Sequence, residues 1–417
     1  MRIAIVGTGI SGLVCAHLLH PRHDITVFEA GDHVGGHTNT VRVDLEGETH
    51  HVDTGFIVHN ERNYPNFVEL MNQLGVATQP STMSFSVSDP RTGLEYRGTN
   101  LNTIFAQRRN LVRPSFLRML ADIVRFNRAA KRLLREANGT DESVSLEQFV
   151  RDGDYSPAFT DQFLVPLGAS IWSADPETFT QFPAVAYARF MDNHGLLDLR
   201  GMPEWRTVTG GSQRYVDRIT APFAERIRLR DPVEKVVRTP DGVEVVSVLD
   251  GPEVFDRVIL ASHSDQALRL LADPSPAERE ILGAIRYQPN VATLHTDERF
   301  LPRSPRARAS WNYHLSGDGG RTATLTYWMN RLQSIESRHQ FLVTLNRHED
   351  IDPDKVLGRY DYAHPVFDAG AMAAQRRRDE IQGVRGTFFA GAYWEYGFHE
   401  DGVRSALDVC RHFGVAL

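Results

Sequence analysis

Three glycines and one glutamate near the start of the chain have the types and spacing needed to bind a diphosphate and a ribose. Gly7, Gly9 and Gly12 form a G-x-G-x-x-G turn, and Glu29 follows. In such a turn the first glycine permits a tight bend, the second lets backbone approach a pyrophosphate, and the third allows close helix–strand packing. A carboxylate at Glu29 would accept hydrogen bonds from both ribose hydroxyls and repel a 2′-phosphate. The pattern predicts a dinucleotide site that disfavours NADP.

The elements around this turn occur in the order that nucleotide binding requires. Residues 1–6 form a largely apolar run rich in β-branched residues, which predicts a buried parallel strand. A helical pattern continues to about Leu19, and residues 24–28 predict a second strand that leads to Glu29. The helix N-terminus offers unpaired N–H groups and a positive dipole end to an anion. This order favours a nucleotide-binding βαβ unit over a structural glycine turn.

Length and composition indicate a globular protein of two domains. The chain has 417 residues, 41% apolar and 24% charged, with a formal net charge of −7. This size exceeds one ordinary core, and the negative charge argues against nucleic-acid binding. We find no transmembrane stretch, signal peptide or metal-binding spacing, so a cytoplasmic protein without a metal is expected. Cys15 and Cys410 fall in apolar helical patterns and are expected to be reduced core residues.

One segment departs from the negative charge of the chain. Residues 108–135 interleave basic and apolar residues around a single acid, Asp122, which predicts one or two basic amphipathic helices. The basic residues are Arg108, Arg109, Arg113, Arg118, Arg125, Arg128, Lys131, Arg132 and Arg135. One interpretation is a surface helix whose apolar face packs on its own domain. The other is a surface that makes a peripheral contact with anionic phospholipid at the inner membrane face, or accepts an acidic substrate.

Changes of pattern divide the chain into alternating segments of two kinds. The predicted boundaries are residues 1–80, 205–272 and 380–417 for a nucleotide-binding domain and residues 81–204 and 273–379 for a substrate domain. We predict an α/β fold in which a Rossmann-like domain is interleaved with an α+β domain that has a helical insertion and a mostly antiparallel sheet. Residues 346–362 are expected to be rich in loops, and residues 403–413 to form a C-terminal helix.

Further motifs make the chain similar to a known group of flavoproteins. The pair Gly35-Gly36 follows the acidic strand end, an Asp-x-Gly turn follows at residues 53–55, and a buried strand ends at Gly391. Together with the first turn, these motifs resemble the FAD-dependent amine oxidase superfamily, which includes phytoene desaturase-like enzymes. A bacterial branch of predicted NAD/FAD-binding oxidoreductases, associated with cyclopropane and methylated fatty-acid enzymes, is similar to this chain at residues 190–197, 205–212, 311–314 and 397–402. The resemblance implies FAD as cofactor and hints at a lipid acyl substrate.

The resemblance also implies which residues hold the FAD. The expected contacts are Gly7, Gly9, Ser11, Gly12, Glu29 and Ala30 for the ADP half; Gly35, Gly36, His37 and Thr38 for the pyrophosphate; Val233 for the adenine; Gly391 and Ala392 for the ribityl chain; and Gly402 and Val403, at a helix start, for the flavin pyrimidine. Family members commonly have an arginine where this chain has His37 and an acid where it has Ala392. A helix dipole at the pyrimidine favours an anionic reduced flavin, and so hydride acceptance.

Titratable residues before the last helix are candidates for proton transfer at the substrate. We prefer His399 as general base because an ordinary histidine pKa lies near neutrality. Glu395, Glu400 and Asp401 are alternatives, and the last two have a second interpretation as helix caps. Weaker candidates, each beside aromatic residues, are His194, His314 and His364.

Two departures from the amine oxidase pattern bear on the substrate. Tyr396 and Phe398 fall near the place where amine oxidases clamp an amine between two rings, but residues 393–396 do not reproduce that pair. Many amine oxidases also place a lysine near flavin N5, and the matching residues 290–299 contain none. These departures favour a hydrophobic substrate over a simple amine.

We therefore expect an FAD-dependent oxidoreductase that takes a hydride from a hydrophobic, lipid-like or fatty-acyl substrate, as desaturases and dehydrogenases do. The alternative within enzymes is a flavin amine or amino-acid oxidase. Two alternatives come from other classes. One is a flavin-dependent isomerase or mutase without net redox, and the other is a flavin-bearing accessory subunit that presents lipid to a partner enzyme.

Overall fold

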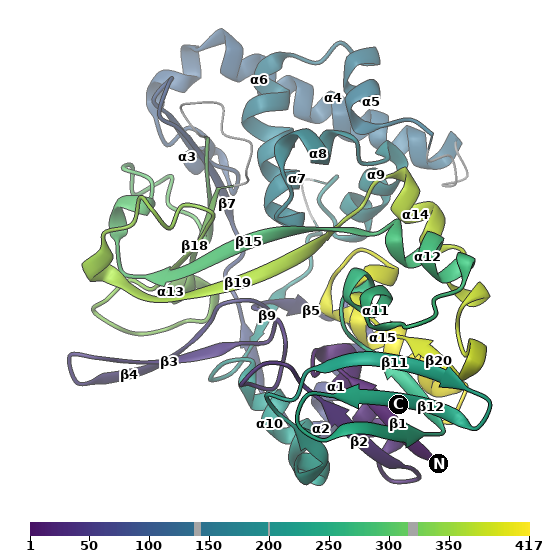
Figure 1. Ribbon diagram of the computed structural model, residues 1–417. Coiled ribbons are helices and arrows are strands. Elements are labelled where there is room, and N and C mark those ends of the chain that lie inside the picture. The colour runs from purple at the N-terminus through teal and green to yellow at the C-terminus, as the bar shows by residue number, and fades with distance from the viewer. Residues whose placement is uncertain (137–142, 199–200, 316–323) are drawn as a thin grey trace.

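The computed structural model describes residues 1–136, 143–198, 201–315 and 324–417, and two sheets of different kinds organise them. A parallel sheet lies at the lower right of Figure 1, and a mixed sheet lies at the upper left beneath a layer of helices. The polypeptide passes between these parts several times. The predicted combination of a Rossmann-like domain with an interleaved α+β part is confirmed.

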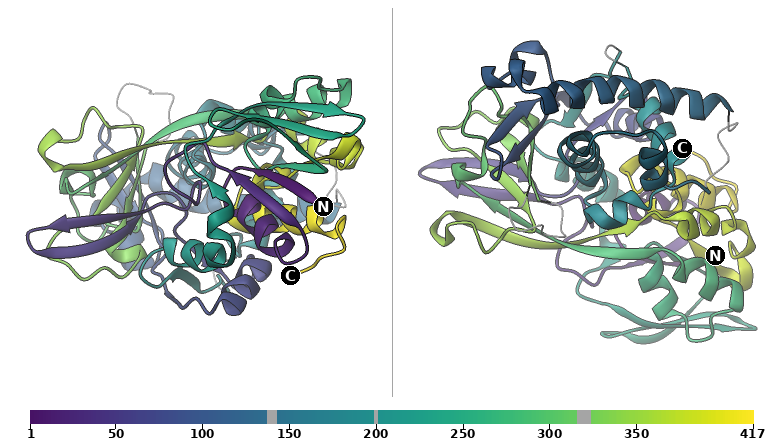
Figure 2. Two further views of the ribbon diagram at one scale, coloured as in Figure 1. Left: turned by 60° about the horizontal axis from the view of Figure 1, so that its bottom comes forward. Right: turned by 90° about the horizontal axis from the view of Figure 1, so that it is seen from above.

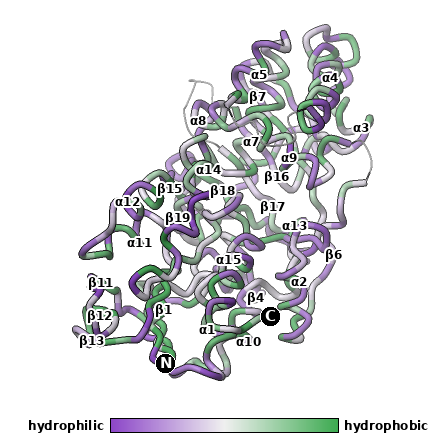
Figure 3. The backbone as a smooth tube through the Cα atoms, turned by 90° about the vertical axis from the view of Figure 1, so that its right-hand side faces the viewer, coloured by the Kyte–Doolittle hydropathy of each residue, from purple (hydrophilic) through white to green (hydrophobic). Residues whose placement is uncertain are grey.

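The parallel sheet is assembled from strands that lie far apart in the sequence. Its order is β10-β2-β1-β14-β20. The strands are β1 (Arg2–Val6), β2 (Asp24–Phe28), β10 (Ile227–Arg228), β14 (Arg257–Leu260) and β20 (Thr387–Phe389). Ile5 of β1 is fully buried and pairs with Val27 on one side and Ile259 on the other. A central strand buried on both faces explains the apolar run at the start of the chain (Figure 3).

Both faces of this sheet are covered. One core contains residues of β1 together with residues of four helices. These helices are α1 (Ile10–Leu19), α2 (Pro65–Leu74), α10 (Gln213–Thr220) and α15 (His399–Arg411). A second core joins the opposite face to an antiparallel three-stranded sheet and three helices. These elements are β11 (Val233–Thr239), β12 (Gly242–Ser247), β13 (Gly251–Phe255), α11 (Ser264–Leu270), α12 (Pro276–Gly283) and α14 (Ala369–Gln375).

The mixed sheet has the order β19-β15-β18-β17-β16-β7-β8. Its strands are β7 (Phe85–Asp89), β8 (Leu94–Arg97), β15 (Arg286–His295), β16 (Trp311–His314), β17 (Leu325–Trp328), β18 (Leu342–Leu345) and β19 (Val356–Val366), and the short helix α13 (Met329–Leu332) follows β17. Neighbouring strands are antiparallel except β7 and β16, which are parallel. β15 and β19 run side by side from this sheet towards the nucleotide-binding part (Figure 1).

The expectation that residues 346–362 are rich in loops is wrong over its second half. β19 begins at Val356 and pairs with β15 along its whole length. None of its residues is fully buried, so its side chains show no apolar alternation that a sequence pattern could detect. The pairing partner, rather than local hydrophobicity, defines this strand.

The helical layer covers the outer side of the mixed sheet. It comprises α3 (Leu101–Ile104), α4 (Pro114–Glu136), α5 (Leu146–Asp152), α6 (Pro157–Phe159), α7 (Val165–Trp172), α8 (Pro176–Thr180) and α9 (Ala184–Asn193). Figure 2 shows α4 along one edge of the molecule. None of the helices in the described part of the chain is long and apolar enough to cross a membrane.

Short strands form two further small sheets. β3 (Thr40–Leu45) and β4 (Glu48–Asp53) form a hairpin, which projects at the left of Figure 1. β9 (Trp205–Val208) does not pair with the parallel sheet. It lies between β5 (His59–Asn60) and β6 (Thr78–Pro80).

Candidate functional site

A cavity of about 630 Å³ lies where the carboxyl ends of the parallel strands face the mixed sheet. Its lining includes Gly7 and Glu29 after β1 and β2, and His263 and Gly391 after β14 and β20. Ligands of open parallel sheets bind at this edge. The size falls within the range of cofactor and ligand pockets, roughly 300–1,000 Å³.

The glycine turn forms one wall of the cavity and leaves room for an anion. A Cβ at Gly12 would lie 2.0 Å from the carbonyl oxygen of Gly7, so helix and turn touch here. A Cβ at Gly9 would meet nothing within 4 Å, whereas a Cβ at Gly36 would lie 2.9 Å from Gly9 Cα. α1 has no side-chain cap and no acidic residue in its first turn. Its N-terminus therefore offers free N–H groups and a positive dipole end to a diphosphate.

Glu29, the residue expected to bind the ribose, lines the cavity. Its carboxylate accepts hydrogen bonds from the backbone N–H of Thr8 at 3.0 Å and of Gly31 at 2.8 Å. These two donors fix the carboxylate beside the glycine turn, where it also lines the cavity together with Ala30 and Val233. The acid is therefore held in place to receive ribose hydroxyls.

The structure brings ten of the predicted cofactor residues to the cavity wall: Gly7, Gly9, Ser11, Glu29, Ala30, Gly36, His37, Val233, Gly391 and Ala392. The other five do not line it: Gly12, Gly35, Thr38, Gly402 and Val403. Gly35 is a close-packing position, since its Cβ would lie 2.4 Å from the carbonyl oxygen of Thr38. The Thr38 hydroxyl is hydrogen-bonded to Tyr215 and His399 behind the wall.

The expected helix start at Gly402 is corrected to His399. The Asp401 carboxylate accepts hydrogen bonds from the backbone N–H groups of Tyr396 and Phe398, at 3.2 and 3.0 Å. With these hydrogen bonds the helix begins one turn earlier, at His399. The Gly402 N–H then donates to the carbonyl of Phe398. A Cβ at Gly402 would lie 2.6 Å from Cγ2 of Ile10, so this glycine serves the crossing of α15 with α1.

Glu400 and Asp401 act as caps, the second interpretation given for them. Glu400 accepts hydrogen bonds from the backbone N–H groups of Asn66 and Phe67 in the first turn of α2. Burial raises the pKa of Asp401 to about 7 and raises that of Glu400. Neither side chain lines the cavity.

His399 lines the cavity, but its surroundings hold its pKa well below the near-neutral value expected of a histidine base. Its ring stacks on Phe56, with centroids 3.6 Å apart, and Nε2 lies 3.0 Å from Thr38 Oγ1 and 2.9 Å from the hydroxyl of Tyr215. Burial and the nearby His59 lower its pKa to about 3. With this low pKa and an occupied Nε2, His399 is a much weaker base than the near-neutral histidine expected from its residue type.

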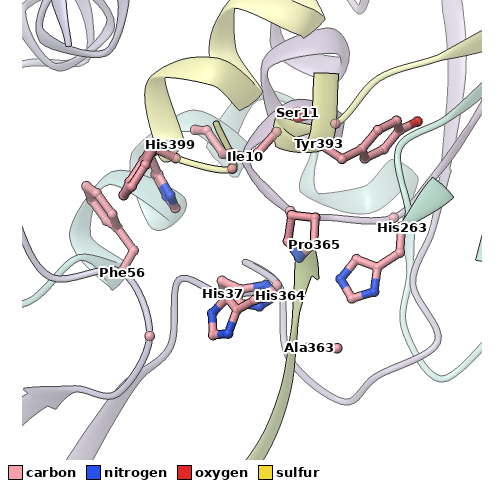
Figure 4. A pocket seen from close by; sticks show the side chains of 18 of the residues that line it. Ile10, Ser11, His37, Phe56, His263, Ala363, His364, Pro365, Tyr393 and His399 are labelled. Carbon is pink, nitrogen blue, oxygen red and sulfur yellow. The ribbon is translucent and has the colours of Figure 1, made fainter. Parts of the chain in front are cut away.

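Three other histidines line the cavity opposite the start of α1 (Figure 4). The ring of His37 lies 5.4 Å from that of His364 and 5.9 Å from that of His263, measured between centroids. Nε2 of His37 is buried and has no hydrogen-bond partner. Burial lowers the pKa of all three, that of His364 to about 4. Sequence reasoning selected His37 but not His263, and gave His364 a place only among weak catalytic candidates.

Aromatic and apolar residues line a large part of the cavity, which is termed the chamber here. Tyr396 and Phe398 line it as predicted residues, and the mixed sheet and α7 supply further walls. These are Met83, Ile171, Trp172, Trp311, Tyr327 and Phe367. The indole N–H of Trp172 donates to the carbonyl of Tyr396 at 3.2 Å, which ties α7 to the segment before α15. The sequence did not reveal this wall, since its residues come from separate segments and follow no motif.

The residues present fit FAD. The cavity offers an uncapped helix end for a diphosphate, a fixed carboxylate for a ribose, a buried unpartnered nitrogen on His37, and a path to an aromatic chamber. No group of three metal-ligating side chains occurs in residues 1–136, 143–198, 201–315 and 324–417.

Comparison with known sequences places the chain in a flavoprotein family. Residues 10–412 match the family model for flavin containing amine oxidoreductase. The AofH protein of Mycobacterium tuberculosis, described as a flavin-containing monoamine oxidase, is 26% identical over 258 residues, which is 59% of this chain and 53% of that protein. The match therefore spans about half the length of this curated relative.

Solved structures share the fold over nearly the whole chain. Cyclohexylamine oxidase from Brevibacterium oxydans has a TM-score of 0.70 and 15% identity, with 99% of both chains covered. A fatty acid isomerase from P. acnes has a TM-score of 0.69 and 16% identity, with 99% of this chain and 98% of that chain covered. Identities this low show the fold alone. The match to the family model shows more than the fold. The chain belongs to the flavin containing amine oxidoreductase family, and FAD is its cofactor.

Proposed function

We propose that the chain is an FAD-dependent oxidoreductase that acts on a neutral, hydrophobic substrate such as a lipid acyl chain. One observation carries the proposal. Among the described residues that line the cavity, Glu29 is the only carboxylate, and it is the residue expected to bind the ribose. The described chamber walls thus present mainly aromatic and apolar side chains, and no acid, to a substrate.

The chamber walls suit an extended apolar group. Trp311 and Tyr327 meet edge to face with centroids 5.2 Å apart, on two neighbouring strands of the mixed sheet. Phe398 packs on Phe190 at 5.2 Å, on the side of the helical layer. Apolar surface of this kind binds a substrate by excluding water, at about 25 cal/mol per Å² buried.

An amine is the alternative that the curated relative suggests. An ammonium group would find aromatic faces, which attract cations by about 0.5–2 kcal/mol. It would find no carboxylate on the described chamber walls, so the cost of desolvating its charge would be only partly offset. This balance favours the neutral substrate.

The first turn of α15 positions polar groups at the chamber entrance. The helix begins at His399 on the cavity wall, so its free N–H groups and positive dipole end lie there. Bound FAD supplies hydride acceptance from a substrate C–H bond. His399 holds the wall through Thr38 and Tyr215, and burial raises the pKa of Tyr396, which keeps its phenol protonated.

The test compares substrates that share a chain and differ in the head group. FAD-loaded protein is mixed anaerobically with methyl oleate, with a phospholipid that carries oleoyl chains, with oleylamine, and with a short diamine. We expect the esters to bleach the visible flavin band and the amines to leave it. Bleaching by the amines alone would contradict the proposal.

A matched pair of variants at Met83 ties the result to the chamber. Met83→Glu places a carboxylate on the wall, while Met83→Leu conserves volume and polarity. We expect the glutamate variant to reduce flavin bleaching by the esters at least about tenfold, with FAD retained, because a buried charge costs several times the thermal energy. Equal rates for the two variants would place substrate binding elsewhere.

A further inference from the structure

The segment from Leu101 to Glu136 has a charge opposite to that of the whole protein. It carries nine basic residues and two acidic ones, whereas the chain has a formal net charge of −7. Asp122 is buried and paired with Arg118 and Arg125, at 3.2 and 2.5 Å. Arg113 and Arg128 have no ion-pair partner among the described residues. A positive surface therefore remains after internal pairing.

Exposed apolar side chains lie within this basic segment. The described residues include twelve exposed large hydrophobic side chains, and five of them fall between residues 101 and 124. Their exposed fractions are 74% for Leu101, 51% for Leu111, 80% for Val112, 42% for Leu117 and 40% for Val124. Five of twelve in so short a segment is a concentration that chance placement does not explain.

These side chains are not needed for packing of the helical layer. The inward face of α4 is supplied by Phe116, Met119 and Phe126, which are almost completely buried in the core. Leu117 and Val124 are seven residues apart, so they share the outward face. Leu111 and Val112 lie in the 3₁₀ turn Arg108–Val112 just before α4. The outward face of the helix thus carries apolar side chains among its basic residues, and no described element covers Leu117 or Val124.

The position of α4 leaves this face accessible. The helix runs along one edge of the molecule and lies at the far end from the parallel sheet (Figures 1 and 2). Polar and apolar residues are mixed along it (Figure 3).

We propose that the outward face of Leu101–Arg128, termed here the basic face, docks on the surface of a bilayer that contains anionic phospholipid. Arginines on this face would meet lipid phosphates, and Leu111, Val112 and Leu117 would enter the boundary between head groups and acyl chains. Charge complementarity favours an anionic partner. Exposed leucine and valine among the arginines favour a lipid surface over nucleic acid, whose backbone offers no apolar counterpart. The inference stands apart from the substrate proposal, because it concerns a surface and not the cavity.

The test is co-sedimentation with vesicles at low salt. We expect the FAD-loaded protein to sediment with vesicles of phosphatidylcholine mixed with phosphatidylglycerol, and to remain free with phosphatidylcholine alone. Raising the salt should weaken the binding, because exposed charges are screened within about 10 Å at 0.1 M salt.

Three variants separate charge from hydrophobicity. Replacing Arg108, Arg109 and Arg113 by Glu should weaken binding about 100-fold or more, since each basic residue near an anionic surface contributes about fivefold. Leu111→Ser with Val112→Ser should also weaken it, at unchanged charge. The control is Arg214→Glu with Arg218→Glu on α10, whose exposed arginines lie at the opposite end of the molecule. It should bind as the wild type does.

The proposal is overturned if the wild type does not sediment with anionic vesicles at low salt, or if the control variant loses binding equally. Retention on heparin without vesicle binding also overturns it and assigns the basic face to another polyanion. The visible flavin band of each variant reports that the protein remains folded, independently of any substrate.

Discussion

Two histidines of the same cavity differ in their hydrogen bonding because their neighbours differ. Nε2 of His399 lies within hydrogen-bonding distance of two hydroxyls, so its ring is a fixed part of the wall. Nε2 of His37 is equally enclosed but has no partner. It lies next to Gly36, which touches the diphosphate turn at Gly9. A nitrogen left unpaired beside an anion site is suited to receive that anion.

The pH dependence of FAD binding tests His37. In the free protein, burial and the neighbouring His364 and His263 hold its pKa well below the ordinary value, so it is neutral near pH 7. A bound diphosphate raises that pKa, so FAD binding takes up a proton and becomes tighter as the pH falls. We expect about a tenfold change in the dissociation constant between about pH 8 and pH 6, measured by quenching of flavin fluorescence.

His37→Gln should abolish most of this pH dependence, whereas His412→Gln, at an exposed position outside the cavity, should keep it. Asp265 and Arg269 also lie near His263. A wild-type affinity that is flat with pH would rule out the histidine as the anion contact.

A second variant tests whether His399 is a base. Because its pKa lies at about 3 and its Nε2 is occupied, we expect His399→Gln to slow anaerobic flavin reduction by less than about tenfold, and by the same factor from about pH 6 to pH 9. Stopped-flow absorbance measures the rate. A loss of 100-fold or more, as removal of a general base causes, would restore the catalytic role.

At the scale of elements, the crossing of α1 and α15 brings the first and last parts of the chain together. Ser11 donates its hydroxyl proton to the carbonyl of Gly402 at 3.0 Å, and a Cβ at Gly402 would overlap Ile10. Glu400, two residues before Gly402, caps α2. The first turn of α15 thus makes hydrogen bonds to both α1 and α2.

Replacing Gly402 by alanine should therefore destabilise the fold. We expect a loss of about 1–3 kcal/mol in the free energy of unfolding, because neither backbone can move without disturbing the cavity. Urea denaturation measures it. Gly283→Ala is the matched control, since this glycine also lies in a helix and its Cβ would meet only Leu268 at 3.6 Å. It should be neutral or stabilising by up to about 1 kcal/mol. Equal effects would mean that the crossing tolerates a methyl group.

The sequence predicts local elements well and their assembly only in part. β1, α1 and β2 were predictable because a strand, a glycine turn and a helix follow one another within thirty residues. β19 was not, because its side chains are half-exposed and its partner lies sixty residues away in β15. The start of α15 was missed because its cap comes from Asp401 inside the helix itself.

The residues of the substrate chamber could likewise be predicted only in part from the sequence. Tyr396 and Phe398 were found through a resemblance, but Trp172, Trp311 and Tyr327 stand on a helix and two strands whose relative position no local pattern encodes. Likewise, the type of residue at His399 suggested a base, whereas burial decides its protonation.

At the scale of the whole molecule, the cavity is built by both sheets. Gly391 follows a parallel strand, while His364 belongs to β19 and Trp311 to β16 of the mixed sheet. A ligand in this cavity therefore touches parts that are far apart in sequence. Binding of the ligand therefore stabilises the whole fold and not one sheet alone.

Hydrogen exchange can show whether FAD binding stabilises both sheets. We expect FAD to slow amide exchange at the ends of β1 and β14 and also at the cavity-lining end of β19, near Ala363 and His364. Mass spectrometry of peptides from the free and FAD-loaded protein measures the change. β13, which does not line the cavity, should be unaffected. Protection confined to the parallel sheet would show that β19 is not part of the cofactor site.

The most direct test of the account is an experimental structure of the FAD-loaded protein with a neutral long-chain ester. We predict adenosine density beside Glu29, diphosphate density between the start of α1 and His37, and the flavin ring at the start of α15. Acyl density should fill the chamber between Trp172 and Trp311. A flavin ring that occupies this chamber, or ester density outside the cavity altogether, would contradict the account.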